Sequence, residues 1–212
     1  MSDRNITIDH GTWNPLYDLW VSQRIDPRLP FDGASAATYM SRWQKRDEGN
    51  TRYAWAIPSP QAAKWIAERC PRIVEVGAGR GYWAKVLSDA GCDVVAYEPT
   101  VENGDLNANH WFASSVAYGL YFPVECGDHQ KAWLHPDRTL MLCWPPYDDG
   151  MASEALAGYR GEQLLYVGEG DGGCCGDDRF WKMVSDGWEE AGDCNIPQWP
   201  GMHDYVTLYR RK

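Results

Sequence analysis

The sequence lacks long apolar runs. None of its segments approaches the roughly 18 consecutive apolar residues that cross a bilayer. Its opening residues, MSDRNITIDH, also lack the apolar stretch of a secretion signal. We therefore expect a cytoplasmic protein that has no membrane partner.

Paired cysteine motifs are also missing. The seven cysteines are odd in number and contain no C-x-x-C spacing. The vicinal pair Cys174-Cys175 has no companion His or Cys at the spacing of zinc ligands. A disulfide framework and a zinc finger both need such spacings. We therefore expect free thiols in a reducing compartment and no bound metal.

Positive charge is scarce. Lys and Arg number 20 against 30 Asp and Glu, which gives a formal net charge of -10. An acidic protein repels a phosphate backbone unless basic residues gather on one face. Basic clusters occur only between Arg42 and Arg52 and in the tail from Arg210 to Lys212. Nucleic acid is therefore a possible but disfavoured partner, and a neutral or cationic small molecule is favoured.

Recognisable sets of nucleophile and base are absent as well. The five histidines are scattered singly, and no Ser–His–Asp or Cys–His set of familiar spacing appears. The pattern favours chemistry that depends on positioning the reactants rather than on a nucleophilic side chain.

What the sequence does contain indicates an α/β fold. Its 212 residues suit one domain. From Arg72 onward, short apolar runs alternate with stripes of helical period, which is typical of a parallel sheet with crossover helices. The predicted strands are Arg72–Val76, Asp93–Tyr97, Tyr121–Glu125, Thr139–Cys143, Gln163–Gly168, Glu189–Asn195 and Tyr205–Arg210. We expect a mostly parallel, seven-stranded sheet with helices on both faces.

Residues 1–55 have no strong period and contain four of the twelve tryptophans. A helix is indicated only around Ala36–Lys45. We expect an irregular, partly helical extension that lies over the sheet, a possible lid rather than an independent domain. The main domain then covers residues 56–212 and opens with a helix that Ser59 caps and Pro60 starts.

A glycine-rich turn follows the first predicted strand. Gly77, Gly79 and Gly81 stand where the apolar run Ile73–Val76 gives way to a helix. Glycines let the backbone approach a ligand closely, and helix-terminal N–H groups can face it. The dinucleotide-binding fingerprint places its third glycine one residue later, where this chain has Tyr82. The spacing therefore favours a nucleotide-like ligand other than NAD.

The acid–x–G–x–G–x–G pattern that starts at Glu75 resembles the first motif of class I S-adenosylmethionine-dependent methyltransferases. The resemblance covers roughly residues 59–212 and implies a Rossmann-like fold with S-adenosylmethionine as the cofactor. It implies that the turn cradles the methionine part and that Glu75 lies near its charged end. Glu98 ends the next strand about 20 residues after the glycines, so we expect it to bind the ribose hydroxyls, with an ordinary solvated carboxylate as the alternative.

Three further residues complete the expected cofactor site. The resemblance suggests that Asp128, in the turn after the third predicted strand, contacts the adenine, with a plain polar turn as the alternative. Tyr82 is a candidate for an aromatic face beside the sulfonium. Cys143 ends the fourth strand next to the same site. For the glycine turn as a whole, the alternative is a tight connection that binds no ligand.

A W-P-P-Y turn, from Trp144 to Tyr147, follows the fourth predicted strand. Its two prolines stop strand pairing and fix a rigid turn at the carboxyl edge of the sheet, where ligands bind in such folds. The turn resembles the (D/N/S)-P-P-(Y/F/W) motif of methyltransferases that modify amino groups, which implies that Tyr147 stacks on a planar acceptor. Trp144 replaces the hydrogen-bond-accepting side chain of that motif. The candidates that could take over its role are the carbonyls of Cys143 and Pro145 and the carboxylates of Asp148 and Asp149.

A second glycine-rich loop, residues 168–176, follows the fifth predicted strand and returns to the same edge of the sheet. So much glycine allows it to move as a lid, and Glu169 could then bind or deprotonate an acceptor. The alternative is a loop that is flexible only because it is exposed. For the W-P-P-Y turn, the alternative is a packed aromatic turn.

Three functions agree with these patterns. The first is transfer of a methyl group from S-adenosylmethionine to an amine, amide or hydroxyl of a small, planar or cationic molecule. Its candidate residues on the acceptor side are Tyr147, Asp148, Trp144 and Glu169. The second is a nucleic-acid amino-methyltransferase, which the P-P-Y turn favours and the negative charge disfavours. The third is a protein that binds the cofactor without catalysis, which Trp144 would permit.

Overall fold

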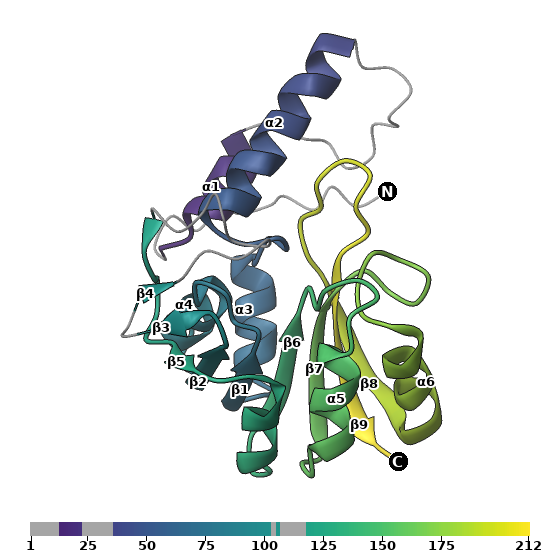
Figure 1. The fold of residues 1–212 in the computed structure, drawn as a ribbon. Helices are drawn as coiled ribbons and strands as arrows, with labels where there is room; N and C mark the ends of the chain where they lie inside the picture. The colour runs from purple at the N-terminus through teal and green to yellow at the C-terminus, as the bar shows by residue number, and fades with distance from the viewer. Residues whose placement is uncertain (1–12, 23–35, 103–104, 107–117) are drawn as a thin grey trace.

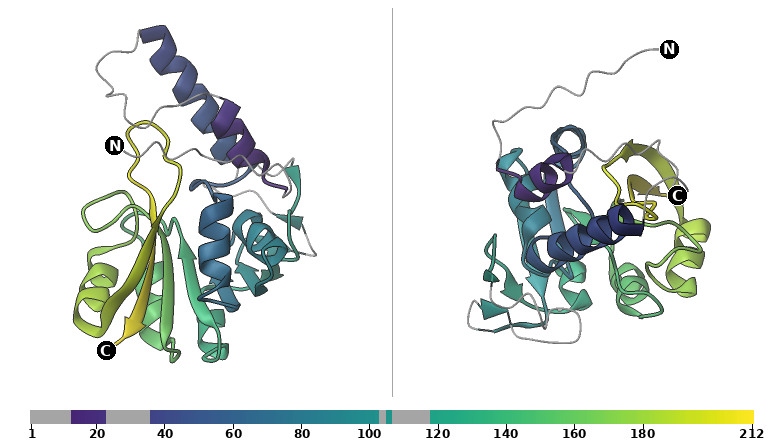
Figure 2. Two further views of the ribbon diagram at one scale, coloured as in Figure 1. Left: turned by 180° about the vertical axis from the view of Figure 1, so that it is seen from behind. Right: turned by 90° about the horizontal axis from the view of Figure 1, so that it is seen from above.

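The computed structural model describes residues 13–22, 36–102, 105–106 and 118–212 (Figure 1). Residues 1–12 and 23–35 of the predicted extension lie outside these ranges. The main body is a sheet with helices against it, and two helices of the amino-terminal segment lie beyond one end of the sheet (Figures 1 and 2). None of the helices in the described ranges has the length and apolar character to cross a membrane.

The sheet has seven strands in the order β5-β2-β1-β6-β7-β9-β8. The strands are β1 (Arg72–Val76), β2 (Asp93–Glu98), β5 (Glu125–Cys126), β6 (Thr139–Cys143), β7 (Gln163–Gly168), β8 (Trp188–Asn195) and β9 (Tyr205–Arg211). Strand β9 is antiparallel to both of its neighbours, and the other pairs are parallel. The predicted mostly parallel, Rossmann-like sheet is therefore confirmed. The strand order reverses between β1 and β6, and ligands bind at such a point in open α/β sheets.

The third predicted strand, Tyr121–Glu125, is wrong over most of its length, because β5 covers only Glu125–Cys126. The N–H of Tyr121 donates to the carbonyl of Arg80 at 2.8 Å, and Pro123 has no N–H to offer a neighbouring strand. The apolar residues of this segment pack against the sheet without pairing with it. The sequence analysis also did not predict the short antiparallel pair β3 (Val101–Glu102) and β4 (Asp105–Leu106).

Helices cover both faces of the sheet, as predicted. They are α3 (Pro60–Ala67), α4 (Tyr82–Asp89), the 3-10 helix η3 (His129–Leu134), α5 (Met151–Gly158) and α6 (Asp178–Gly187). Helices α3 and α4 pack on the face that carries Ile73 and Met141. The other helices pack on the face that carries Val74 and Leu142. Because side chains alternate along a strand, the neighbours Ile73 and Val74 are both fully buried, each in a different layer.

The start of α3 follows its predicted signal. The Ser59 hydroxyl accepts a hydrogen bond from the N–H of Ala62 at 3.1 Å, and Pro60 occupies the first helical position. A proline costs nothing there because its missing N–H would have no partner inside the helix. This helix therefore begins at the expected residue.

The described part of the amino-terminal segment contains helices α1 (Pro15–Ser22) and α2 (Ala36–Arg52), which pack on the core of the main body. Helix α1 is not predicted by the sequence pattern, and α2 extends beyond the predicted Ala36–Lys45. Leu16 is fully buried in the same cluster as residues of α3 and α4. A Cβ atom at Gly49 would lie 3.0 Å from both Leu16 Cδ1 and Trp199 Cζ2. The close packing of α2 at this point therefore depends on a glycine.

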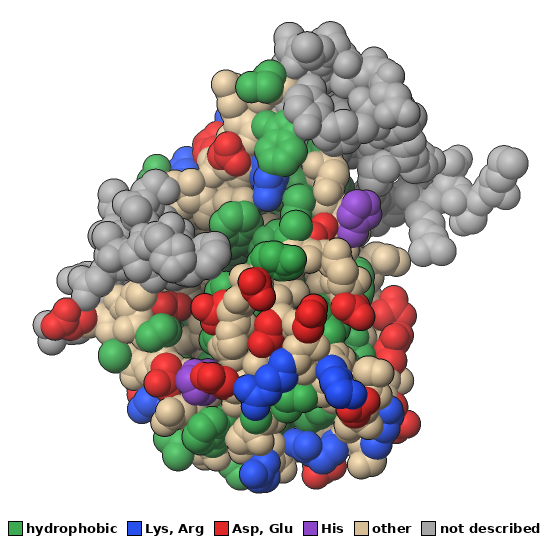
Figure 3. Space-filling view, turned by 45° about the vertical axis from the view of Figure 1, so that its right-hand side comes forward, with side chains coloured by type: hydrophobic (Ala, Val, Ile, Leu, Met, Phe, Trp, Pro, Cys, Tyr) green, Lys and Arg blue, Asp and Glu red, His purple; other side chains and the backbone are tan. Residues whose placement is uncertain are grey.

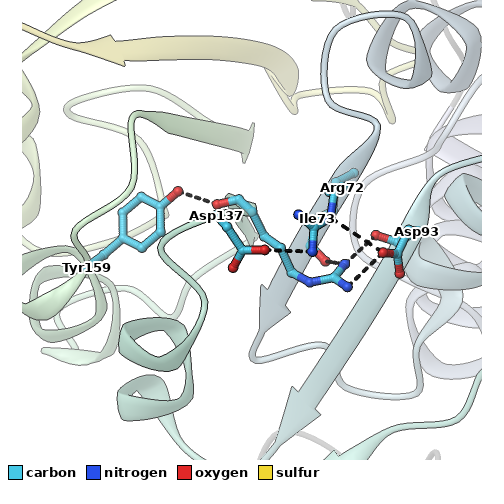
Figure 4. Close-up of polar contacts among 6 residues, drawn as sticks. Arg72, Ile73, Asp93, Asp137 and Tyr159 are labelled. Atoms are coloured by element: carbon cyan, nitrogen blue, oxygen red, sulfur yellow. Dashed lines mark hydrogen bonds and ion pairs between the residues drawn. The ribbon is translucent and has the colours of Figure 1, made fainter.

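Polar contacts join the strands at the other end of the sheet (Figure 4). Arg138 donates to the carbonyl of Asp93 at 2.8 Å and to its carboxylate at 2.7 Å. Arg72 pairs with Asp137 at 2.6 Å, and the Tyr159 hydroxyl donates to the carbonyl of Arg138. Arg72 and Asp93 begin β1 and β2, Asp137 and Arg138 directly precede β6, and Tyr159 follows α5. The network therefore fixes the edge of the sheet opposite the glycine turn.

Candidate functional site

A cavity of about 800 Å³ opens at the carboxyl edge of the sheet, where the strand order reverses. Its walls come from the glycine turn after β1, the end of β2, the W-P-P-Y turn after β6, and the carboxyl-terminal half of α2. The amino-terminal segment and the sheet therefore both contribute to the cavity wall. Cavities of this size accommodate small ligands and cofactors.

The glycine turn takes a conformation that excludes side chains. Gly77 and Gly81 have φ angles of +71°, in the left-handed region that favours glycine. A Cβ atom at Gly81 would lie 2.8 Å from Phe122 Cβ and 2.9 Å from Val124 Cγ2. Gly77 and Gly79 line the cavity, whereas Gly81 begins α4 beside it. At Gly77 and Gly79 the turn thus presents bare backbone to the cavity.

Glu98 lies at the end of β2 with a fixed carboxylate. Its Oε2 accepts the N–H of Gly79 at 3.1 Å, and its Oε1 accepts the N–H of Thr100 at 3.1 Å and the Thr100 hydroxyl at 2.7 Å. The side chain is buried and lines the cavity. Because carboxylates have about four acceptor positions in total, one remains for a ligand.

Glu75 is the buried acid that precedes the turn. It is 2% exposed, lines the cavity, and its Oε2 has no hydrogen-bond partner among the described residues. Burial raises the pKa of Glu75 to about 8 with help from the nearby Glu98 charge, while the backbone N–H of Ala84 opposes the rise. At neutral pH this carboxyl group therefore holds a proton until a cation approaches it.

Two further residues of the cavity wall have buried atoms without partners in the described part of the chain. They are Asn50 Oδ1, on the last turns of α2, and Arg80 Nη2, in the glycine turn. The other nitrogens of Arg80 donate to the carbonyl of Gly119 at 2.7 Å and to the carbonyls of Thr51 and Arg52. Arg80 therefore ties the end of α2 to the turn.

Tyr82 lines the cavity and also holds α1. Its hydroxyl donates to Asn14 Oδ1 at 2.9 Å and accepts the N–H of Leu16 at 2.8 Å. Asp128, which follows β5, lines the cavity and caps η3 by accepting the N–H of Gln130 at 2.9 Å. Both expected cofactor residues thus border the cavity while keeping a structural contact.

The indole of Trp144 makes its hydrogen bond to the protein and does not offer it to a ligand. The indole Nε1 donates to Asp204 Oδ1 at 2.8 Å, and the ring stacks on Trp55 with centroids 5.0 Å apart. Burial raises the pKa of Asp204 to about 7, although the hydrogen bond from Trp144 opposes the rise. The φ angle of Trp144 is +50°, which costs energy in a residue with a side chain. The turn is therefore held in a strained conformation by the indole and its partner.

The other residues of the W-P-P-Y segment differ in position. Tyr147 lines the cavity and is 66% exposed at its rim. Asp149 also lines the cavity and caps α5 by accepting the N–H of Met151 at 2.9 Å. Asp148 has a φ angle of +52° and does not belong to the described cavity wall. Cys143 lines the cavity, and burial raises the pKa of its thiol, so it stays neutral.

Glu169 braces the second glycine-rich loop. It accepts the N–H of Cys174 at 3.0 Å and the N–H of His203 at 3.0 Å, and the His203 ring lies 3.5 Å away. Burial acts to raise the pKa of Glu169, but these donors outweigh it and lower the pKa. Among the described residues, Cys174 rather than Glu169 forms the cavity wall here.

The sequence patterns did not single out Arg46, Asn50 and Arg80 as candidate ligand-binding residues. For Arg80, its position inside the glycine turn was the one feature of the sequence that could have identified it as a ligand-binding residue. Arg46 and Asn50 belong to a segment without a motif, and α2 brings them to the cavity by packing. Among the described residues, no cluster of three or more His, Cys, Asp or Glu side chains could hold a metal ion.

No protein-family model matches the chain, and no curated protein matches it in sequence. Among solved structures it is 14% identical to magnesium protoporphyrin IX methyltransferase from Synechocystis with bound S-adenosylmethionine, over 92% of this chain and 91% of that one, with a TM-score of 0.43. It is 16% identical to 1,6-didemethyltoxoflavin-N1-methyltransferase from Burkholderia thailandensis, over 88% and 97%, with a TM-score of 0.44. An rRNA methylase from Streptococcus thermophilus is 13% identical over 73% and 98%, with a TM-score of 0.43. Sequence identities and TM-scores this low do not assign a function to the chain.

Proposed function

We propose that this chain binds S-adenosylmethionine in the cavity and transfers the methyl group to an amine, amide or hydroxyl of a small, planar or cationic molecule. The proposal is carried by the three buried atoms without hydrogen-bond partners in the described part of the chain, Glu75 Oε2, Asn50 Oδ1 and Arg80 Nη2. Two of them are oxygens and one belongs to a cation. An α-amino acid group offers the complement, because its ammonium donates hydrogen bonds and its carboxylate accepts them.

The energetic cost of these atoms supports the same ligand. A buried polar group without a partner costs about 1–3 kcal/mol, so a ligand that satisfies several of them binds much more tightly than one that does not. A neighbouring ammonium would also favour the charged form of Glu75 and lower its pKa from about 8. NAD has no ammonium group and therefore cannot offer this cation to Glu75.

The nucleoside part of the cofactor fits the other side of the glycine turn. Glu98 has a fixed carboxylate with acceptor capacity left for a ribose hydroxyl. Asp128 stands further along the same wall and is our candidate for the adenine contact. This arrangement agrees with the roles that the glycine motif implies.

The reaction itself needs few chemical groups from the protein. When bound, S-adenosylmethionine supplies a methyl group on a positively charged sulfur. The protein then has to hold the acceptor in line with that methyl group and exclude water. Tyr82 and Trp144 belong to the cavity wall, and an aromatic face toward the sulfonium would be worth about 0.5–2 kcal/mol. Tyr147 at the rim is our candidate for contact with the acceptor.

The amino-terminal segment acts in this proposal as a cover for the site. We treat residues 1–55 as the covering segment and residues 56–212 as the main domain. Support comes from α2, which supplies part of the cavity wall, and from the hydrogen bonds that Arg80 makes to the carbonyls of Thr51 and Arg52. Excluding water from the site requires such a cover.

A small acceptor in the cytoplasm is favoured over nucleic acid. On the face shown in Figure 3, acidic side chains form a band directly below the hydrophobic ones at the middle of the molecule. Such a band repels phosphates. All seven cysteines are free, as expected in a reducing compartment.

A cofactor-binding protein without catalysis is the second candidate function. It is favoured by Trp144, whose indole is bound to Asp204 and offers no acceptor to an incoming amine. Methyl transfer to any small molecule in an acceptor screen would rule it out.

Calorimetry tests the cofactor directly. S-adenosylhomocysteine should bind at least tenfold more tightly than methylthioadenosine, which has the nucleoside but no amino acid group. Asn50→Ala should weaken the binding of S-adenosylhomocysteine but not of methylthioadenosine, so the difference between their affinities should become smaller. The exposed control Asn195→Ala should leave this difference unchanged. Binding of NAD without binding of S-adenosylhomocysteine would show the proposal to be wrong.

A further inference from the structure

Arg46 is a cation in the cavity wall that the proposed cofactor site does not use. Its guanidinium carbon lies 4.6 Å from the ring centroid of Trp43 and 5.8 Å from that of Trp55. Within the described ranges it makes no hydrogen bond and no ion pair. Arg80, the other arginine in the wall, already donates to three carbonyls. Arg46 is therefore the arginine that remains open to a ligand.

The stacked position of Arg46 determines what it can bind. A guanidinium that packs on an aromatic ring keeps its N–H groups directed outward in its own plane. That edge matches the two oxygens of a carboxylate, which accepts two parallel hydrogen bonds. A primary ammonium or another cation would be repelled at the same place. The geometry thus favours an anionic, planar group over a cationic one.

The surroundings of Arg46 favour a flat molecule. Trp55 stacks on Trp144 at an interplanar angle of 23°, and the hydrogen bond to Asp204 holds the Trp144 ring in place. Tyr147 stands exposed at the rim of the same cavity. Aromatic surfaces of this kind bind planar rings by stacking.

We propose that the methyl acceptor is an aromatic carboxylic acid, whose carboxylate is bound by Arg46 and whose ring lies against the aromatic wall formed by Trp55, Trp144 and Tyr147. This inference rests on the proposed function and narrows its acceptor from planar or cationic to planar and anionic. The amine or hydroxyl that receives the methyl group would be carried by the same ring.

Nearby acids do not prevent anion binding. Asp47 and Asp149 also belong to the cavity wall, but both are exposed, so the high dielectric constant of water weakens their repulsion of an anion. The charge of Arg46 acts to lower the pKa of Asp204, but burial still raises that pKa to about 7, so Asp204 carries only part of a negative charge at neutral pH. Asp204 and Glu169 both have hydrogen-bond donors, from Trp144 and from the N–H groups of Cys174 and His203. A charge-assisted pair of hydrogen bonds to Arg46 is short-ranged and specific, and it outweighs screened repulsion.

The test uses three planar probes that differ mainly in charge: para-aminobenzoate, para-aminobenzamide and para-aminobenzamidine. Each is titrated by ligand-observed NMR into protein saturated with S-adenosylhomocysteine. We expect the anionic probe to bind at least tenfold more tightly than the neutral and cationic ones. Equal binding, tighter binding of the amidine, or no binding of the benzoate would overturn the inference.

Substitutions at Arg46 separate its role from that of the cofactor site. Arg46→Gln should remove at least tenfold of the benzoate affinity, and Arg46→Lys should restore only part of it, because lysine keeps the charge but not the planar pair of donors. Lys45→Gln is the matched control, since Lys45 pairs with Glu48 on the same helix and does not line the cavity. Affinity for S-adenosylhomocysteine should stay within about threefold in all three variants. If the unmodified protein did not bind S-adenosylhomocysteine at all, that result would instead contradict the proposed function.

Discussion

The backbone N–H of Gly79 donates a hydrogen bond to Glu98 Oε2 at 3.1 Å, across two neighbouring strands. Strands β1 and β2, which precede these residues, pair in parallel with Val76 opposite Tyr97. The contact joins the glycine turn to a carboxylate that is 4% exposed. The conformation of the turn and the orientation of Glu98 therefore depend on each other.

Removing the Glu98 carboxylate should weaken cofactor binding. Glu98→Ala takes away the expected ribose acceptor and leaves the Gly79 N–H without its partner, so the affinity for S-adenosylhomocysteine should fall by about 1–3 kcal/mol in calorimetry. Glu98→Gln keeps one acceptor oxygen and should lose less. Glu125→Gln, at the exposed end of β5, is the control and should bind normally. Unchanged affinity in Glu98→Ala would place the ribose elsewhere.

Stability should fall as pH rises because of Glu75. Burial raises the pKa of its carboxyl from 4.5 to about 8, so the folded state keeps a proton that the unfolded state loses in this interval. The unfolding free energy contributed by this group is fully present below the lower value. It is lost at up to about 1.4 kcal/mol per pH unit until the higher value is passed.

Denaturant unfolding of Glu75→Gln measures this effect. The variant has no ionisable group at this position, so its stability should depend less steeply on pH between about 5 and 8 than that of the unmodified protein. Asp204, with a pKa near 7, contributes in the same direction and remains in both proteins. Parallel stability curves for the two proteins would contradict the assignment to Glu75.

Tyr147 should govern use of the acceptor without affecting the cofactor. Because it is 66% exposed at the cavity rim, Tyr147→Ala should fold normally. We expect the dissociation constant of S-adenosylhomocysteine to stay within about threefold and turnover of the acceptor to fall tenfold or more, a loss of about 1.4 kcal/mol in transition-state stabilisation. Equal losses in cofactor affinity and turnover would instead support a packed aromatic turn without a role in acceptor binding.

Substituting Gly81 should be more damaging than strain alone explains. Gly81→Ala puts a Cβ atom 2.8 Å from Phe122 Cβ at a φ angle of +71°. Gly119 has a similar φ angle of +67°, but a Cβ atom there would meet nothing within 4 Å, so Gly119→Ala reports the cost of the conformation itself. That cost is about 1–2 kcal/mol. Thermal unfolding should show a clearly larger loss for Gly81→Ala, and equal losses would contradict the contact.

The polar network at the amino edge of the sheet should affect stability and not binding. Arg138→Ala removes the hydrogen bonds to the carbonyl and carboxylate of Asp93 and should cost about 1–3 kcal/mol of unfolding free energy. The control Lys182→Ala breaks an exposed pair with Asp186 and should cost about 0.5 kcal/mol or less. S-adenosylhomocysteine affinity should not change in either, because both residues are remote from the cavity.

The sheet and its helices were largely predictable because they depend on local periodicity. Buried strands such as Ile73–Val76 and the cap at Ser59 follow from short-range sequence patterns. Tyr121–Glu125 fails because Tyr121 contributes its N–H to Arg80, a partner that no local pattern identifies. Tertiary contacts decided this segment, and its strand propensity did not.

The site divides in the same way. Glu75, the glycines and Glu98 form a linear motif, and the structure brings them together at one wall of the cavity. The orientation of Trp144 depends on Asp204, 60 residues later in the chain, and could not be read from the turn itself. Arg46 reaches the cavity only because α2 packs above it, which sequence spacing does not encode.

Arg80 has a consequence for how the protein responds to its ligand. One guanidinium, 4% exposed in the residue as a whole, holds the carbonyls of Thr51 and Arg52 at the end of α2 together with that of Gly119. A ligand that favours the present shape of the turn must also favour docking of α2, and docking of α2 raises ligand affinity by the same factor. Deleting the helix would remove two of the three carbonyls that accept hydrogen bonds from this cation, so truncation should destabilise the glycine turn as well as open the cavity. Docking of α2 and ligand binding at the glycine turn are therefore coupled, and each favours the other.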